Sequence, residues 1–305
     1  MIYTITANPS IDYVIQLEKL NTGNVNRVQS DVKLPGGKGV NVSRILAELA
    51  LPSVALGFVG GFTGQFIQNK LNNASIDCRF TEVEEDTRIN VKLKDSVEET
   101  EINGQGPHIS AGTVDNLKQQ LAKLEAGDIV FMSGSLPPNL PASFYKDLIP
   151  MIQAHNAEFV IDTTGQALLD TLAEKPLVIK PNHHELAELF DTQFANQGEI
   201  IAAGRKLLDK GAQHVLVSMA GDGALLITPD HAYLGGTPKG TVINSVGAGD
   251  SMIAGFVGTF AQHHDALAAF KTSLACGSAT AFSEDLATSA KINELLPQIE
   301  ITQVD

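Results

Sequence analysis

The chain has 305 residues, with 21 Lys and Arg against 35 Asp and Glu, so its formal net charge is −14. A hydrophobic fraction of 43% with 18% charged residues excludes a disordered chain, and the length is ample for a sizeable core. The acidic balance argues against nucleic acid or an anionic membrane surface as a partner, because both require a basic surface.

The two cysteines, Cys78 and Cys276, stand apart in the sequence, which predicts neither a CxxC metal site nor a disulfide framework. Residues 1–6 are strand-like and lack the basic leader of a signal peptide. No apolar stretch reaches the roughly 20 residues that a membrane span requires. We therefore expect a soluble protein with reduced thiols, located in the cytoplasm.

Short, continuous apolar runs recur along the chain and predict strands that are buried on both faces of a sheet. They lie at 54–59, 128–132, 158–161, 177–179 and 214–217, and helical periodicity marks 114–124, 143–154 and 198–210 between them. This alternation predicts a doubly wound, mainly parallel α/β sheet. Ligands of such sheets bind beyond the carboxyl ends of the strands, so the loops there are the candidates for function.

Two stretches, 11–16 and 88–94, alternate between apolar and polar residues instead. One face of the second stretch is apolar and carries Ile89, Val91 and Leu93, and the other is polar and carries Arg88, Asn90, Lys92 and Lys94. The pattern predicts a small accessory sheet, or lid, inserted at about 11–34 and 86–106 into a single domain of residues 1–305. The acidic stretch 81–86 is expected to be a solvated hinge or turn.

The strongest local signal is Asn-Ser-Val-Gly-Ala-Gly-Asp at 244–250, followed by an apolar helical run. The amides of Gly247, Ala248 and Gly249, with the positive end of the helix, can form an anion hole for a phosphoryl group. Asp250 stands at its edge, where a carboxylate can accept the proton of an attacking hydroxyl. The alternative is a glycine turn with Asp250 as a capping residue.

A second glycine loop at 35–44 also precedes a helical pattern. Glycines surround Lys38, so that backbone and an ammonium group can approach an oxygen-rich ligand. The spacing differs from GxxxxGK[ST], so a P-loop mechanism is not indicated. A flexible connection with a solvated lysine is the alternative.

Two further loops follow predicted strands. In 180–185, Asn182 and Glu185 can position Mg²⁺ through water beside nucleotide phosphates, or they can form a helix capping box. The loop 218–223 can line a nucleotide or can be a simple hairpin turn. The adjacent His183 and His184 point apart without a further ligand, so neither is assigned to a metal site.

The order of these four loops resembles the phosphofructokinase B family of ribokinase-like sugar kinases. The resemblance runs from residue 1 to about 300 and covers both family signatures, at 36–61 and 244–255. It implies a ribokinase-like three-layer αβα sandwich with a mainly parallel central sheet and a small β lid. The motifs at 6–13, 25–28, 35–39 and 133–138 look like the branch that acts on phosphorylated ketohexoses.

The resemblance implies ATP-dependent phosphorylation of fructose 1-phosphate at its 6-hydroxyl, with ATP as co-substrate and Mg²⁺ as cofactor. Asp250 matches the catalytic base, and the amides of 247–249 would stabilise the transferring group. Asn182 and Glu185 match the motif that positions Mg²⁺ through water. The implied nucleotide-binding residues are Lys180, Asn182, Ser218, Ala220, Gly221, Gly223 and Gly249.

On the sugar side, the matching residues are Asp12, which would hold sugar hydroxyls, and Gly37, Asn41 and Asn90 beside it. The phosphate that the substrate already carries requires local cations, for which Lys38 and Arg88 are best placed. Arg27 is a third candidate that could equally be solvated or lie between subunits. The apolar face of the lid strand needs a cover, often a second subunit's lid in this family, so a homodimer is expected.

Two alternatives remain within the resemblance: a tagatose-6-phosphate kinase, and a non-catalytic protein that binds sugar phosphate or nucleotide on the same fold. The presence of Asp250 favours an enzyme, because a binding protein needs no base at an anion hole. A Rossmann dehydrogenase is disfavoured, since no GxGxxG opens the first βαβ unit.

Overall fold

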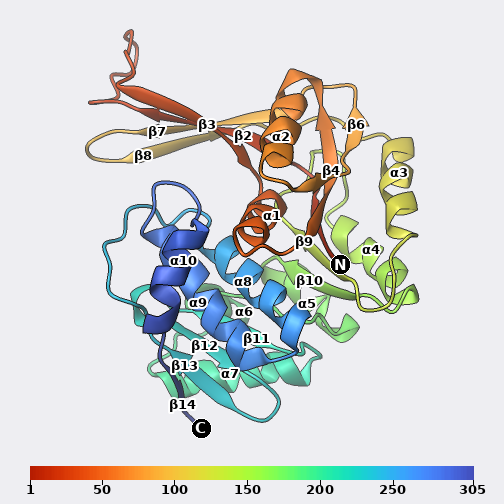
Figure 1. Ribbon diagram of the computed structural model, residues 1–305, viewed down its shortest axis with the longest axis vertical. Coiled ribbons are helices and arrows are strands. Elements are labelled where there is room, and N and C mark those ends of the chain that lie inside the picture. Colours follow the sequence, from red (N-terminus) through yellow and green to blue (C-terminus); the bar gives the residue numbers. More distant parts are fainter.

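A parallel sheet forms the centre of the computed structural model, which describes residues 1–305 (Figure 1). Its strands run in the order β10-β9-β1-β4-β5, with β6 also paired to β4, and every pair is parallel. They are β1 (Ile2–Thr6), β4 (Ser53–Gly60), β5 (Asp77–Cys78), β6 (Thr81–Val83), β9 (Ile129–Ser133) and β10 (Glu158–Asp162). The mainly parallel sheet predicted from the continuous apolar runs is confirmed.

A second, antiparallel sheet follows in the order β11-β12-β13-β14. Its strands are β11 (Val215–Ser218), β12 (Ala224–Ile227), β13 (Ala232–Gly235) and β14 (Ile301–Gln303). The prediction of a full strand at 177–179 is wrong, because the segment pairs at single points only. Leu177 N donates to Phe159 O of β10 at 2.9 Å, and Ile179 forms an isolated bridge with Val215 of β11. This buried segment therefore links the two sheets.

Helices cover both faces of the sheets (Figure 1). One face carries α1 (Lys38–Glu48), α8 (Ala248–His263), α9 (Ala266–Ala281) and α10 (Ser289–Leu295). The other carries α3 (Ala111–Leu121), α4 (Phe144–Ala154), α5 (Gly165–Leu169), α6 (His183–Leu189) and α7 (Gln197–Asp209). Short 3₁₀ turns lie at η1 (Leu172–Glu174), η2 (Ala220–Asp222) and η3 (Leu296–Gln298). This is the expected three-layer αβα sandwich.

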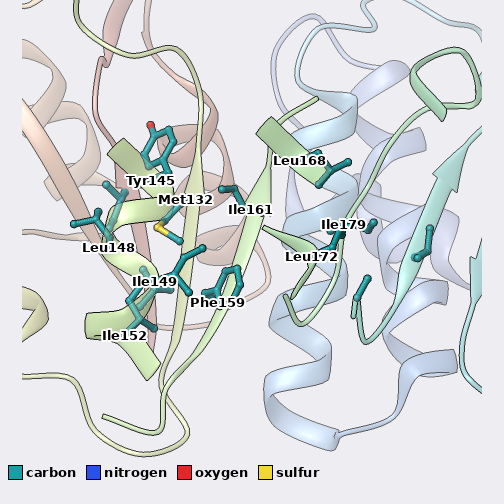
Figure 2. Packing of buried hydrophobic residues seen from close by; sticks show 14 of the residues in the cluster. Met132, Tyr145, Leu148, Ile149, Ile152, Phe159, Ile161, Leu168, Leu172 and Ile179 are labelled. Atoms are coloured by element: carbon teal, nitrogen blue, oxygen red, sulfur yellow. The ribbon is translucent and has the colours of Figure 1, made fainter. Parts of the chain in front are cut away.

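The alternation of side chains along β9 shows why the strands are continuously apolar. Val130 and Met132 pack into the core under α3 and α4, whereas Ile129 and Phe131 pack into the core under α1 and α8. Figure 2 shows part of the first core, in which Met132 and Phe159 of the sheet face the aliphatic side chains of α4. Both faces of the strand are buried, so no polar position interrupts the run.

The lid is a separate mixed sheet that projects from the body (Figure 1). Its order is β3-β2-β7-β8, made by β2 (Ser10–Gln16), β3 (Ser30–Gly36), β7 (Arg88–Lys94) and β8 (Glu99–Asn103). β2 pairs with β7 in parallel, and the two outer pairs are antiparallel. The root of the lid packs on α2 (Gly61–Asn73) through Ile11, Ile67 and Leu71.

The prediction of a solvated turn at 81–86 is wrong in its first half. Thr81–Val83 forms strand β6, and Thr81 is buried against the end of β4. Along β7 it is the polar face that is covered. Asn90 and Lys92 are each 8% exposed, whereas Ile89 on the apolar face is 41% exposed. The polar face of β7 is therefore turned toward the body of the protein, where a ligand could bind between the lid and the body.

None of the helices has the length and apolar character that a membrane span requires.

Candidate active site

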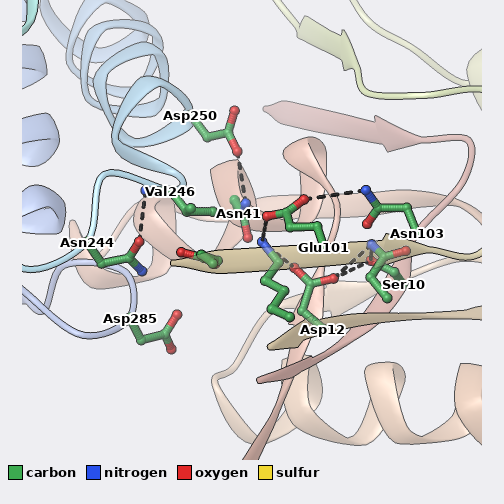
Figure 3. Close-up of polar contacts among 12 residues, drawn as sticks. Ser10, Asp12, Asn41, Glu101, Asn103, Asn244, Val246, Asp250 and Asp285 are labelled. Carbon is green, nitrogen blue, oxygen red and sulfur yellow. Dashed lines mark hydrogen bonds and ion pairs between the residues drawn. The ribbon is translucent and has the colours of Figure 1, made fainter. Parts of the chain in front are cut away.

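The N-termini of two helices, α1 and α8, lie next to each other and define the site. α1 begins after Gly37 and α8 begins after Gly247. Asn41 of α1 donates from Nδ2 to Oδ2 of Asp250 in the first turn of α8 at 2.8 Å, across 209 residues of sequence (Figure 3). Helix N-termini carry unpaired N–H groups and partial positive charge, so the junction is suited to bind an anion.

The loop before α8 turns its amides toward this junction. Gly247 has a left-handed φ of 79°, which a residue with a side chain rarely adopts. The amide of Ala248 donates to Ser245 O at 3.2 Å, whereas the amides of Gly247 and Gly249 have no acceptor within the chain. Of the three amides expected to form an anion hole, two are therefore free to bind a ligand.

Asp250 is only 8% exposed, and its environment shifts its titration. Burial raises the pKa of the Asp250 carboxyl to about 6, and the nearby Asp162 adds to the rise. The hydrogen bond from Asn41 and the ammonium groups of Lys38 and Lys180 act against it and hold the pKa down. A carboxylate that titrates close to neutral pH is well matched to accept a proton from a hydroxyl.

Two lysines stand beside Asp250. Lys38 Nζ pairs with Oδ2 of Asp162 at 2.8 Å. A Cβ on Gly249 would lie 3.0 Å from Nζ of Lys180, so the glycine leaves room for that ammonium. Burial works to raise the pKa of Asp162, but Lys180 and Lys38 outweigh it and hold that pKa below its usual value. The result is a compact group of two buried carboxylates and two ammonium groups.

The lid carries the polar groups expected on the sugar side (Figure 3). Asp12 of β2 accepts at Oδ1 from Ser10 Oγ at 2.8 Å and from Asn90 Nδ2 of β7 at 3.1 Å. Asp12 and Asn90 are paired in the parallel ladder, which fixes them side by side. A cavity of about 670 Å³ lies between the lid and the body, and Asp12, Asn41 and Lys92 line it.

The cations expected to bind the sugar phosphate are separated. Arg88 donates from Nη2 to Ser135 Oγ at 2.9 Å and from Nε to Asn8 O at 3.2 Å. Ser133, the last residue of β9 and two residues before Ser135, donates from Oγ to Oδ2 of Asp162, the partner of Lys38. Arg27 is exposed in the β2–β3 loop, at the end of the lid opposite to Arg88. Arg88 and Lys38 thus lie at two ends of residues 133–135, and Arg27 is not brought to them within this chain.

The two loops expected to bind nucleotide lie next to each other, because Asn182 and Ser218 form a parallel bridge. The capping box is present: Asn182 Oδ1 accepts from Glu185 N at 2.9 Å, and Glu185 Oε2 accepts from Asn182 N at 2.8 Å. Residues 218–223 also form the hairpin connection between β11 and β12. Both structural alternatives are therefore realised, and Glu185 keeps one carboxylate oxygen without a partner.

Three residues of the site were not assigned from the sequence. Asp162 directly follows the predicted strand 158–161, and Ser135 lies three residues after the predicted strand 128–132, so the rule that ligands bind beyond the carboxyl ends of strands could have found both. Lys92 was placed only on the polar face of the lid strand. Its burial beside Asp12 depends on how the lid meets the body, and no local pattern encodes that.

Comparison with known proteins agrees with this geometry. The family model described as pfkB family carbohydrate kinase matches residues 5–293. The chain is 47% identical to 1-phosphofructokinase of Bacillus subtilis and 39% identical to D-tagatose-1-phosphate kinase of Bacillus licheniformis, each over 100% of both chains. Phosphofructokinase-2 from Escherichia coli, in complex with substrates and products, superposes with a TM-score of 0.92 at 26% identity, covering 97% of this chain and 98% of the other. The resemblance inferred from the loop motifs is confirmed, and the chain belongs to the pfkB family of carbohydrate kinases.

Proposed function

We propose that the protein transfers the γ-phosphoryl group of ATP to the 6-hydroxyl of fructose 1-phosphate, giving fructose 1,6-bisphosphate and ADP. The observation that carries this proposal is Asp250, a buried carboxylate with a pKa of about 6 in the first turn of α8 beside free amides. The full-length similarity to the Bacillus subtilis 1-phosphofructokinase supports the choice of acceptor.

In this proposal Asp250 removes the proton of the 6-hydroxyl as the oxygen attacks the γ-phosphorus and ADP leaves. The free amides of Gly247 and Gly249 donate to the oxygens of the group in transfer. Lys38 and Lys180 add positive charge beside the phosphoryl group in transfer. Protein dipoles and cations that are already in place stabilise the charge at no further reorganisation cost.

Mg²⁺ fits this site as an ion held mainly by the nucleotide. No cluster of three or more His, Cys, Asp or Glu side chains forms a closed metal cage. Mg²⁺ in kinases typically takes one or two carboxylates, several waters and the substrate phosphates, so a closed cage is not needed. Glu185, with its free oxygen, and Asn182 would position the ion through water, and the bound ion would neutralise phosphate charge.

The nucleotide is assigned to the paired loops beside Lys180. Ser218 and Gly223 begin and end the hairpin, and Ala220 and Gly221 are exposed between them. Gly249 is close enough to Lys180 that a phosphate bound at the start of α8 would contact both. We also infer a cytoplasmic location, which agrees with the free thiols of Cys78 and Cys276.

The acceptor sugar is assigned to the lid side, where Asp12 and Asn90 would bind hydroxyls and Gly37 and Asn41 lie beside them. Arg88 with Ser135 would bind the phosphate that the sugar already carries. Lys38 was expected to share that role, but its ammonium is held at Asp162 near Asp250. We therefore assign Lys38 to the phosphoryl group in transfer.

A homodimer would cover the apolar outer face of the lid. Ile89 is 41% exposed and Ile102 is 58% exposed, and they lie near Val91 of the same face. A second copy of this chain supplies a matching apolar surface, since a twofold axis pairs a patch with itself. Arg27 is a candidate ligand contact only for a site that is shared between the two copies.

The first test is a coupled assay of ADP release with ATP and Mg²⁺. Fructose 1-phosphate, tagatose 1-phosphate, tagatose 6-phosphate, fructose 6-phosphate and free fructose are compared, with Asp250→Asn as the control. We expect turnover to be highest on fructose 1-phosphate and to fall by at least about a hundredfold in the variant. A preference for a tagatose phosphate would keep the mechanism and change the acceptor, whereas no turnover on any sugar would favour a binding protein.

The pH dependence of kcat/KM tests Asp250 as the base. The carboxylate must be deprotonated to accept a proton, so kcat/KM should rise with pH through about 6 and then level off. Asn41→Ala removes a hydrogen bond that lowers the pKa of Asp250, so the midpoint should move up by about one pH unit. The sugar phosphate titrates in the same range, but identically for both proteins. Coincident midpoints would contradict the assignment.

Arg88→Ala and Lys38→Ala should separate the two cation sites. Loss of Arg88 should raise the KM for the sugar phosphate about 10- to 100-fold and leave the KM for ATP nearly unchanged. Loss of Lys38 should instead lower kcat about 100-fold or more, with a smaller change in the sugar KM. Steady-state kinetics with both substrates varied make the comparison. If Lys38→Ala raised only the sugar KM, the original assignment of Lys38 would be restored.

Sedimentation velocity tests the dimer. Wild-type protein is expected to sediment as a dimer at micromolar concentration, and Ile89→Asp should give a monomer because a charge at the covered face is costly. Leu267→Asp in α9 is the matched control, since Leu267 is 39% exposed but lies on the body. A monomeric wild type, or an Ile89→Asp dimer, would reject the lid as the interface.

A further inference from the structure

Lys92 is a buried lysine that the proposed chemistry does not yet use. It lies on β7, directly opposite Glu101 of β8, and its side chain is 10% exposed. An ammonium group taken out of water needs charged partners or hydrogen bonds. A surface position would avoid this cost, so the burial of Lys92 calls for a functional explanation.

Its partners within the chain leave much of its bonding capacity free. Lys92 Nζ is 3.2 Å from Glu101 Oε1 and 3.7 Å from Asp12 Oδ2. The second distance is too long for a hydrogen bond. A lysine has three N–H donors, so at least two of those of Lys92 have no acceptor in the chain. The side chain lines the cavity between the lid and the body, where a ligand could supply those acceptors.

Asp12 has one carboxylate oxygen that accepts hydrogen bonds and one that is free. Its Oδ1 accepts from both Ser10 and Asn90, while its Oδ2 accepts no hydrogen bond and lies 3.7 Å from the Lys92 ammonium. A free acceptor and a free donor therefore stand 3.7 Å apart at the same cavity wall. This arrangement suits two neighbouring hydroxyl groups of a sugar ring, one donating to Asp12 and the next accepting from Lys92.

We propose that Lys92 is a specificity-determining residue that, together with Asp12, binds adjacent ring hydroxyls of the acceptor sugar and selects their configuration. This inference rests on the proposed sugar-phosphate kinase function. Fructose and tagatose differ only in configuration at C4, so inversion there turns one of two neighbouring oxygens to the opposite face of the ring. Either Asp12 or Lys92 then loses its partner, and a buried charged group without a partner penalises binding.

The experiment compares kcat/KM for fructose 1-phosphate and tagatose 1-phosphate in wild-type protein and in Lys92→Met. The wild type should favour fructose 1-phosphate about 10- to 100-fold. Lys92→Met should raise its KM by a similar factor, reduce the preference to within about threefold, and leave the KM for ATP unchanged. If the wild type prefers another acceptor, that sugar and its C4 epimer are compared instead.

Lys94→Met is the matched control, because Lys94 is the next residue on the same face and pairs with Glu99 in the same ladder, at 3.3 Å. It should keep both the preference and the KM for sugar within about twofold. Thermal midpoints of all variants report whether the lid remains folded. A loss of preference in Lys94→Met equal to that in Lys92→Met would overturn the assignment.

Glu101→Gln and the double variant Lys92→Met/Glu101→Gln separate ligand contact from charge balance. If Lys92 contacts the sugar, Glu101→Gln keeps the preference and the double variant is as unselective as Lys92→Met. If Lys92 only neutralises Glu101, the double variant recovers the preference, which overturns the inference. A wild type that turns over no sugar phosphate overturns the proposed function itself, whereas turnover with unchanged selectivity in Lys92→Met overturns this inference alone.

Discussion

The burial of one carboxylate, Asp250, at the junction of two helices governs how the site is built. A buried charge is costly unless opposite charges and hydrogen-bond donors compensate it. Asn41 supplies the hydrogen bond, and Lys38 and Lys180 supply positive charge. These lysines are in turn balanced by Asp162, whose pKa they lower. The groups come from four distant segments, so the site exists only when the whole sandwich has formed.

The same local balance explains how a protein with a net charge of −14 can bind two anionic substrates. At physiological ionic strength a charge acts over about 8 Å, so the acidic surface has little influence on the bottom of the site. Positive groups there are placed in pairs with neutral or anionic partners, as in Lys38 with Asp162 and Arg88 with Ser135. The two pairs contact opposite ends of residues 133–135, through Ser133 beside Asp162 and through Ser135.

Much of the fold follows from patterns that are local in sequence. The stretches 54–59 and 129–132 carry no polar side chain because a hydrophobic core lies on each face of their strands, and this burial is visible without a structure. The run at 177–179 misled the prediction because apolar character reports burial and says nothing of the pairing partners that a strand requires. Glycines and a carboxylate at 247–250 were similarly visible, since helix starts and turns are encoded locally.

The direction of long side chains could not be predicted in this way. Lys38 was assigned to the sugar phosphate from its place on the glycine loop, yet its ammonium is held by Asp162, 124 residues away. Lys92 is a further case, because its distance from Asp12 depends on the registers of three lid strands. A lysine has four flexible carbons, so its position in the chain fixes only a radius, and the tertiary partner fixes the direction.

The alternation of side chains along β7 determines which residues lie on each of the two faces of the lid. Residues 88, 90, 92 and 94 lie on one face of β7, and the residues between them lie on the other, because successive side chains of a strand point to opposite faces. The pairing of Asp12 with Asn90 and of Glu101 with Lys92 fixes that register. A slip by one residue would turn Ile89 and Val91 to the face that now carries Asn90 and Lys92, and would bury no charge beside Asp12. The same hydrogen-bond ladder therefore sets both the polar inner face and the apolar outer face of the lid. A change in strand register would alter both faces at once.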